Sequence, residues 1–103
     1  MFKKYDYGSD AANIEKYGSK IPPSLNVGDI KKVPIAMFVG LQDDLADPVD
    51  TRNLRSSLNT VSFYQEYDQM DHGSFLIGKN MDYFSDVIAQ LHKANEEALV
   101  YIQ

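Results

Sequence analysis

Hydrophobic residues form distinct patterns along the last two-thirds of the chain, from residue 33 onward. Residues 33–40 (VPIAMFVG) are a short, nearly unbroken apolar run that ends at glycine. Such a run is typical of a parallel strand that is buried on both faces. Residues 61–67 (VSFYQEY) alternate between polar and apolar and are rich in β-branched and aromatic side chains, which predicts a second strand.

A helical pattern closes the chain. Apolar residues recur there at the i, i+3, i+4, i+7 spacing of an amphipathic helix, and Asn80 is a suitable N-cap. We therefore expect a helix over about 81–99. Its apolar face consists of Phe84, Val87, Ile88, Leu91 and Ala94.

A second helix is predicted between the two strands. Asp47 is a suitable N-cap and Pro48 a suitable first helical residue, so we expect the helix to begin at Pro48. Val49, Leu54 and Leu58 give it a weak apolar face.

The first 32 residues form a different kind of segment, rich in Gly, Ser, Pro, Asn and Tyr. We expect an ordered, loop-rich lead-in with one short helical turn over about 10–17. The side chains expected to hold it together are Phe2, Tyr5, Tyr7, Tyr17 and Leu25.

The order strand, helix, strand defines the fold class. Two strands joined through a helix are expected to be parallel, which gives an α/β fold with βαβα order over residues 33–103. Two parallel strands alone leave both sheet edges unpaired and cover neither face well. The pattern therefore favours the edge of a larger sheet whose other strands lie outside these residues.

Composition narrows the function classes. The chain has 103 residues, no cysteine and a net charge of −5, and its lysines and arginines form no run longer than a pair. Clustered positive charge is what nucleic acids and anionic membranes bind, so we expect neither as a partner. Disulfides and thiolate metal sites are excluded. The longest apolar run, about six residues, is far shorter than the ~20 that span a bilayer, and residues 1–10 do not resemble a signal peptide.

Candidate chemistry lies in the loops that follow the strands, where open α/β sheets carry their active groups. Asp43, Asp44 and Asp47 follow the first strand, and His72 follows the second. An acid on one loop and a histidine on the next is the layout of two members of a Ser-His-Asp triad. Asp44 is expected to face solvent and Asp47 to cap a helix, although Asp47 is the second candidate for the acid. The other histidine, His92, is expected on the surface of the last helix.

Residues 40–50 (GLQDDLADPVD) resemble the stretch around the catalytic aspartate of the acid lipases, the gastric and lysosomal lipase and cholesteryl-ester hydrolase family, which reads G-G-x-D-x-L-A-D. The resemblance places the acid at Asp43. The family's histidine lies 29 positions later in a segment like H-L-D-F, which matches His72 in residues 71–75 (DHGSF). Residues 5–9 (YDYGS) are similar to the family's F-D-W-G-S. Further matches in order are Asn13, Tyr17, Pro22-Pro23, Asn26-Val27 and Val33-Pro34.

The resemblance implies an α/β-hydrolase fold and hydrolysis of triacylglycerol or sterol esters, with Asp43 and His72 as catalytic residues. It implies no cofactor, and we expect no metal site. The family's second glycine is Leu41 here, and its Leu-Asp after the histidine is Gly73-Ser74. The family's G-x-S-x-G nucleophile motif is absent. We therefore expect the C-terminal portion of such an enzyme, inactive alone, with an N-terminal hydrolase segment as its partner and a secreted or lysosomal parent.

A second function remains open at this point. The same residues would also suit a small non-catalytic βαβα domain that binds a protein partner through its exposed sheet edge.

Overall fold

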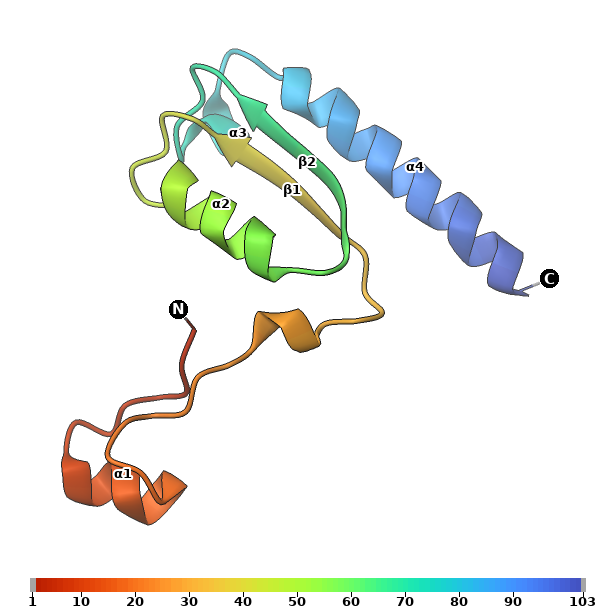
Figure 1. Cartoon of the computed structure of the whole chain (residues 1–103). Coiled ribbons are helices and arrows are strands. Elements are labelled where there is room, and N and C mark those ends of the chain that lie inside the picture. Colours follow the sequence, from red (N-terminus) through yellow and green to blue (C-terminus); the bar gives the residue numbers. More distant parts are fainter. Residues whose placement is uncertain (1, 103) are drawn as a thin grey trace. The chain divides into compact units, whose positions relative to one another are not determined.

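The computed structural model describes the backbone of residues 2–102 and the side chains of residues 2–100. The chain forms two compact units, one that runs to Lys31 and one that begins at Lys32 (Figure 1).

The first unit contains helix α1 (Asp10–Tyr17) and the short 3-10 helix η1 (Val27–Asp29). The predicted helical turn over residues 10–17 is confirmed. The hydroxyl of Ser9 accepts the amide of Ala12 at the start of α1, and Gly18 ends the helix with a φ of 71°. That conformation is one that glycine adopts without steric cost.

A buried asparagine holds this unit together. The side-chain oxygen of Asn13 accepts the amide of Tyr7, and its side-chain nitrogen donates to Asp6 and to the carbonyl of Lys20. Asn13 is 3 % exposed, so these bonds satisfy a polar group that would be costly to bury unpaired. The tyrosines expected to hold this unit together do contact one another, since the Tyr17 hydroxyl donates to the carbonyl of Tyr5 and the Tyr7 ring lies against the rings of Tyr5 and Tyr17. Phe2 and Leu25, also expected there, are about half exposed, at 53 % and 50 %.

The second unit is a strand–helix–strand motif followed by two helices (Figure 1). The parallel pairing predicted for the two strands is confirmed, with a register that runs from Ile35 opposite Val61 to Gly40 opposite Tyr67. The elements are β1 (Ile35–Gly40), α2 (Pro48–Ser57), β2 (Val61–Tyr67), α3 (Ser74–Ile77) and α4 (Asp82–Ile102).

Strand β1 differs from its prediction in two ways. It begins at Ile35 rather than Val33, because Pro34 has no amide for the ladder and the first ladder bond runs from Ile35 to Thr60. The prediction that it is buried on both faces is wrong for this chain. Only Val39 and Gly40 are buried, and Ala36 is exposed, because the helices cover the small sheet incompletely.

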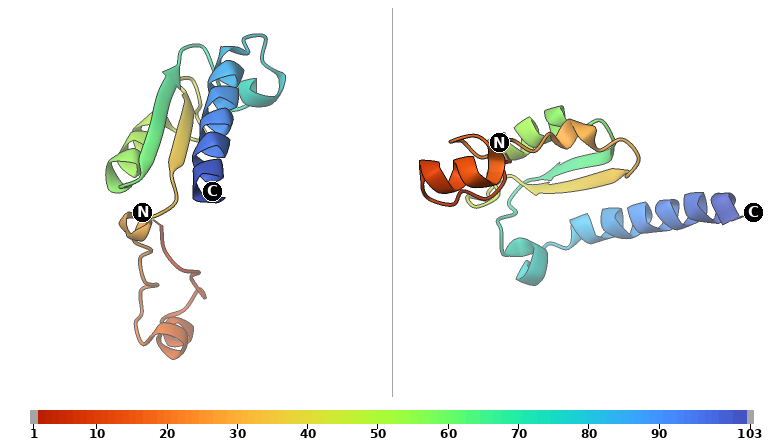
Figure 2. Two further views of the ribbon diagram at one scale, coloured as in Figure 1. Left: turned by 90° about the vertical axis from the view of Figure 1, so that its right-hand side faces the viewer. Right: turned by 90° about the horizontal axis from the view of Figure 1, so that it is seen from below.

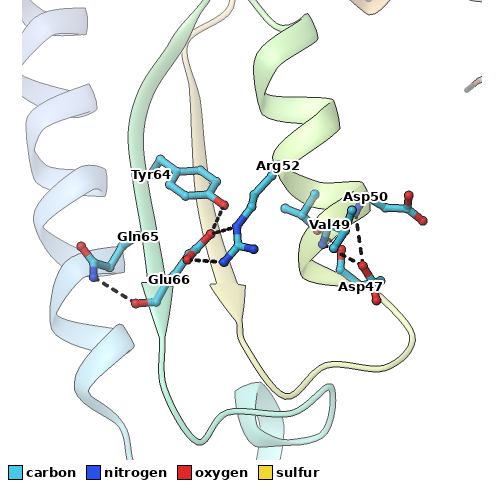
Figure 3. Close-up of polar contacts among 8 residues, drawn as sticks. Asp47, Val49, Asp50, Arg52, Tyr64, Gln65 and Glu66 are labelled. Carbon is cyan, nitrogen blue, oxygen red and sulfur yellow. Dashed lines mark hydrogen bonds and ion pairs between the residues drawn. The ribbon is translucent and has the colours of Figure 1, made fainter.

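Helix α2 begins as predicted. Asp47 caps it by accepting the amides of Val49 and Asp50 at 2.7 and 3.4 Å. Arg52 then ties the helix to β2 through two bonds to the carboxylate of Glu66, at 2.7 and 2.8 Å (Figure 3).

These contacts favour the ionised form of Glu66. The bonds from Arg52, together with the hydroxyl of Tyr64 at 2.6 Å, lower the pKa of Glu66 to about 2. The pair therefore stays charged and fixes α2 against the strand at ordinary pH. The guanidinium of Arg55 lies 4.2 Å from the centre of the Tyr64 ring, which adds a cation–π contact between the same elements.

Helix α4 lies on the opposite side of the sheet from α2 (Figure 2). It spans Asp82–Ile102, close to its predicted range, and Asn80 accepts the amide of Asp82 at 2.8 Å. Its first turns make the contacts with the rest of the unit. Tyr83 is 8 % exposed and donates to the carbonyl of Phe75 in α3, and Tyr67 of β2 donates to Asp86 at 2.6 Å. The short helix α3 was not predicted.

No helix among the described residues has the length and hydropathy needed to cross a membrane.

The end of β1 makes a close backbone contact with the segment after β2. A Cβ atom on Gly40 would lie 2.5 Å from the carbonyl oxygen of Met70, a residue that is 1 % exposed. The same carbonyl accepts the amide of Gln42 at 2.9 Å. Glycine at position 40 therefore allows the two loops to meet.

We predict that Gly40→Ala destabilises the chain by about 1–3 kcal/mol, the usual cost of forcing extra volume into a packed site. Chemical unfolding followed by circular dichroism measures it. Gly73→Ala is the control, since a Cβ there meets only a carboxylate oxygen of Asp71 at 3.6 Å. Equal stability of the two variants would show that the contact does not constrain the fold.

Candidate active site

The loops that follow β1 and β2 meet at one end of the sheet. Parallel pairing places the carboxyl ends of both strands at the same edge. The amide of Leu41 donates to Tyr67 at 3.0 Å, and the amide of Gln42 donates to Met70. These bonds continue the ladder past the strands and hold residues 41–47 beside residues 68–73.

Asp43 is buried and fixed by the backbone of its own loop. Its side chain is 5 % exposed. One carboxylate oxygen, Oδ1, accepts the amides of Leu45 and Ala46 at 2.9 and 2.8 Å. The other, Oδ2, lies 3.1 Å from Nδ1 of His72. The structure therefore brings together the two residues that the sequence singled out.

The backbone amides also set the charge of Asp43. The bond from Ala46 is the largest influence that lowers its pKa below the ordinary value, burial acts in the opposite direction, and the bonds from Leu45 and His72 lower it further. Charged oxygens that accept several amide bonds are favoured over the protonated form. Asp43 is thus an ionised acceptor.

His72 has the opposite environment. Its side chain is 63 % exposed, and its bond to Asp43 is the contact that orients the ring. An ionised carboxylate can only accept, so in the neutral imidazole the proton lies on Nδ1 and the lone pair on Nε2. This is the tautomer that a general base needs at Nε2.

The other candidate residues lie apart from this pair. Asp44 is exposed, as expected, and the carboxylate of Asp47 is occupied in capping α2 rather than directed at His72. His92 is exposed on α4, also as expected. Among the described residues, no group of three or more acidic, histidine or cysteine side chains is arranged to hold a metal ion.

One pair of residues near the histidine, Asp71 and Ser74, was not predicted from the sequence. Their side chains and amides bond to one another across the turn that carries His72. The spacing D-x-x-S just before a helix was a usable signal, because it resembles the spacing of helix-capping residues.

A parallel strand–helix–strand unit with polar groups gathered at the carboxyl ends of its strands belongs to the α/β class of proteins. No protein-family model matches the chain. Similarity to individual proteins is clear. The chain is 35 % identical over 100 residues to the tear acid lipase-like protein of Mesocricetus auratus, covering 96 % of this chain and 25 % of that protein.

Two further relatives have similar identity. The human lysosomal acid lipase/cholesteryl ester hydrolase is 34 % identical over 75 % of this chain and 19 % of its own length. The rat gastric triacylglycerol lipase is 33 % identical over 73 % of this chain and 19 % of its own length. The chain is therefore a partial member of the acid lipase family, and its relatives imply an α/β-hydrolase fold. It spans a quarter or less of the length of these curated relatives.

We predict that Asp43→Asn reverses the tautomer of His72. The amide oxygen of asparagine would keep the bonds from Leu45 and Ala46, so its NH₂ group would face Nδ1 and force the proton to Nε2. Long-range ¹H–¹⁵N correlation spectra, at a pH where imidazole is neutral, report the tautomer. Asp47→Asn removes the same charge from the same loop and should leave His72 unchanged. An Nδ1–H tautomer in Asp43→Asn would contradict the geometry.

We also predict that the carboxylate of Asp43 titrates below the ordinary value of about 3.9. A lowered pKa in the folded state stabilises the fold above the unfolded-state pKa, and this stabilisation disappears as the pH falls through the folded-state pKa. Carbon-13 titration of the side chain measures the pKa directly. His72→Ala should leave most of the lowering in place, because the bond from the Ala46 amide is its largest cause. A return to the ordinary value in that variant would show that the histidine, not the loop, sets the charge.

Proposed function

We propose that the chain supplies the aspartate and the histidine of a Ser-Asp-His triad in an enzyme that hydrolyses esters of neutral lipids. The hydrogen bond between Asp43 and His72 is the observation that carries the proposal. The substrate class follows the names of the relatives, a cholesteryl ester hydrolase and a triacylglycerol lipase. The parent protein is then secreted or lysosomal.

The proposed mechanism uses the two ring nitrogens of His72 for different tasks. Nε2 takes the proton of a serine hydroxyl as the serine oxygen attacks the ester carbonyl, and then gives that proton to the departing alcohol. Nδ1 remains bonded to Asp43, which stabilises the imidazolium. Water then attacks the acyl-enzyme by the same route and releases the fatty acid.

The loop amides favour the ionised form of Asp43 in mild acid as well as at neutral pH. The backbone amides that lower its pKa keep the carboxylate ionised where a solvated aspartate begins to protonate. The acid of the triad would then continue to orient His72 at low pH.

The serine, its oxyanion hole and further strands are proposed to come from an N-terminal hydrolase segment. Residues 33–103 would be the last two strands of the sheet with their helices, and residues 1–32 a lead-in. Exposed apolar residues in the second unit form the surface that such a segment would cover, because exposed apolar surface is typical of a site of contact with another segment. They include Val33, Leu45, Val49, Leu76, Ile77, Phe84, Leu91 and Leu99.

A chimera tests the proposal. The Mesocricetus auratus relative, with its matched 100 residues replaced by this chain, should hydrolyse a triacylglycerol or cholesteryl ester emulsion, whereas the chain alone should not. Asp43→Asn in the chimera should lower kcat by about 10⁴-fold, the loss seen for this change in a well-characterised triad. Asp47→Asn should retain near-normal kcat, because asparagine caps a helix as well as aspartate does.

Loss of activity in Asp47→Asn with retention in Asp43→Asn would assign the acid to Asp47. A folded but inactive chimera would contradict the proposed function. In that case the non-catalytic domain that binds a partner through its sheet edge becomes the better account.

A further inference from the structure

We propose that Asp71 and Ser74 are positioning residues that hold the turn of His72 against Asp43, an inference that rests on the catalytic role proposed above for His72. The two residues flank the histidine turn and form a closed set of hydrogen bonds around it.

The bonds run in both directions between the two residues. The amide of Asp71 donates to the hydroxyl of Ser74 at 3.1 Å. The carboxylate oxygen Oδ1 of Asp71 accepts the amide of Ser74 at 2.9 Å and its hydroxyl at 2.8 Å. The amide of Ser74 also approaches the carbonyl of Asp71 at 3.2 Å. His72 and Gly73 are thus enclosed in a short loop whose ends are joined by side chains as well as backbone.

The histidine needs this support because its ring has little packing of its own. A side chain that is 63 % exposed is free to rotate unless its backbone is placed so that one rotamer reaches a partner. The partner, Asp43, is buried and fixed in the neighbouring loop, so a small shift of residue 72 would open the 3.1 Å contact. Geometry of catalytic groups is sensitive to such shifts.

The flanks of the turn are anchored independently. Upstream, the carbonyl of Met70 accepts the amide of Gln42, which belongs to the loop of Asp43. Downstream, the hydroxyl of Tyr83 donates to the carbonyl of Phe75. Asp71 and Ser74 therefore connect the two anchored residues, Met70 before His72 and Phe75 after it.

The hydroxyl of Ser74 accepts one hydrogen bond and donates another. Substitutions can therefore test these two bonds separately from the size of residue 74 and from the charge of Asp71. Ser74→Ala removes both bonds of the hydroxyl, whereas Ser74→Thr keeps both. Asp71→Asn keeps an oxygen that accepts the Ser74 bonds but removes the negative charge. A positioning role predicts that Ser74→Thr and Asp71→Asn behave like the original chain and that Ser74→Ala does not.

The tautomer and the exchange of the His72 ring proton provide the test, measured on the whole chain by ¹H–¹⁵N correlation at a pH where imidazole is neutral. We expect Ser74→Ala to lower the Nδ1–H fraction of His72 and to speed exchange of that proton with water by more than tenfold. His92 is an internal control in every spectrum and should not change. In the active chimera, Ser74→Ala should lower kcat with little change in KM, and Ser74→Thr should restore it.

An unchanged Nδ1–H fraction and exchange rate in folded Ser74→Ala would overturn the proposal. If circular dichroism shows that Ser74→Ala is unfolded, the same two measurements on His72 are made in Asp71→Ala. That variant keeps the bond from the amide of residue 71 to the Ser74 hydroxyl. The ring measurement does not depend on ester hydrolysis. If the chimera is inactive but the tautomer of His72 still depends on Ser74, the proposed function is contradicted and the positioning role is not.

Discussion

The parallel pairing of β1 with β2 is the constraint on which the site depends. It places the carboxyl ends of both strands at one edge, where Gly40 approaches the backbone of Met70 closely enough that no side chain fits between them. Residues 29 positions apart in sequence, Asp43 and His72, meet because of this contact. The Arg52–Glu66 pair supports the same arrangement by fixing the connecting helix to β2.

The acid and the histidine are held by different means. Asp43 is buried, and the amides of its own loop fix both its position and its charge. His72 is exposed and depends on the placement of its backbone. A rigid acceptor paired with an accessible imidazole suits a base that must exchange protons with a third group while keeping one tautomer. Backbone bonds hold both loops, and the turn that carries His72 has the additional side-chain bonds between Asp71 and Ser74.

The sequence predicted much of the second unit because its patterns are local. β2 runs over residues 61–67 as expected, α2 begins at Pro48 behind its Asp47 cap, and α4 follows its apolar periodicity. Burial was predicted less well. An apolar run indicates a strand that can be buried on both faces, but cover depends on other elements, and only Val39 and Gly40 of β1 are buried here.

The candidate site was predicted only in part, because it too depends on contacts between segments that are distant in sequence. Asp43 and His72 could be singled out as candidates from their place after the strands and from the acid lipase resemblance, but the distance between them depends on the tertiary fold. Asn13 matches the acid lipase family, but so does the exposed Asn26, so the resemblance does not predict which of the two is buried. The bonds between Asp71 and Ser74 depend on a turn conformation that periodicity does not describe.

In the proposed enzyme, His72 is oriented by Asp43 and accepts the proton of a serine from another segment. A crystal structure of the chimera with a phosphonate ester trapped on its nucleophile tests this most directly. We expect Nε2 of His72 within about 3 Å of the serine oxygen, with Nδ1 still bonded to Asp43. A different histidine beside the trapped serine, with His72 directed to solvent, would contradict it.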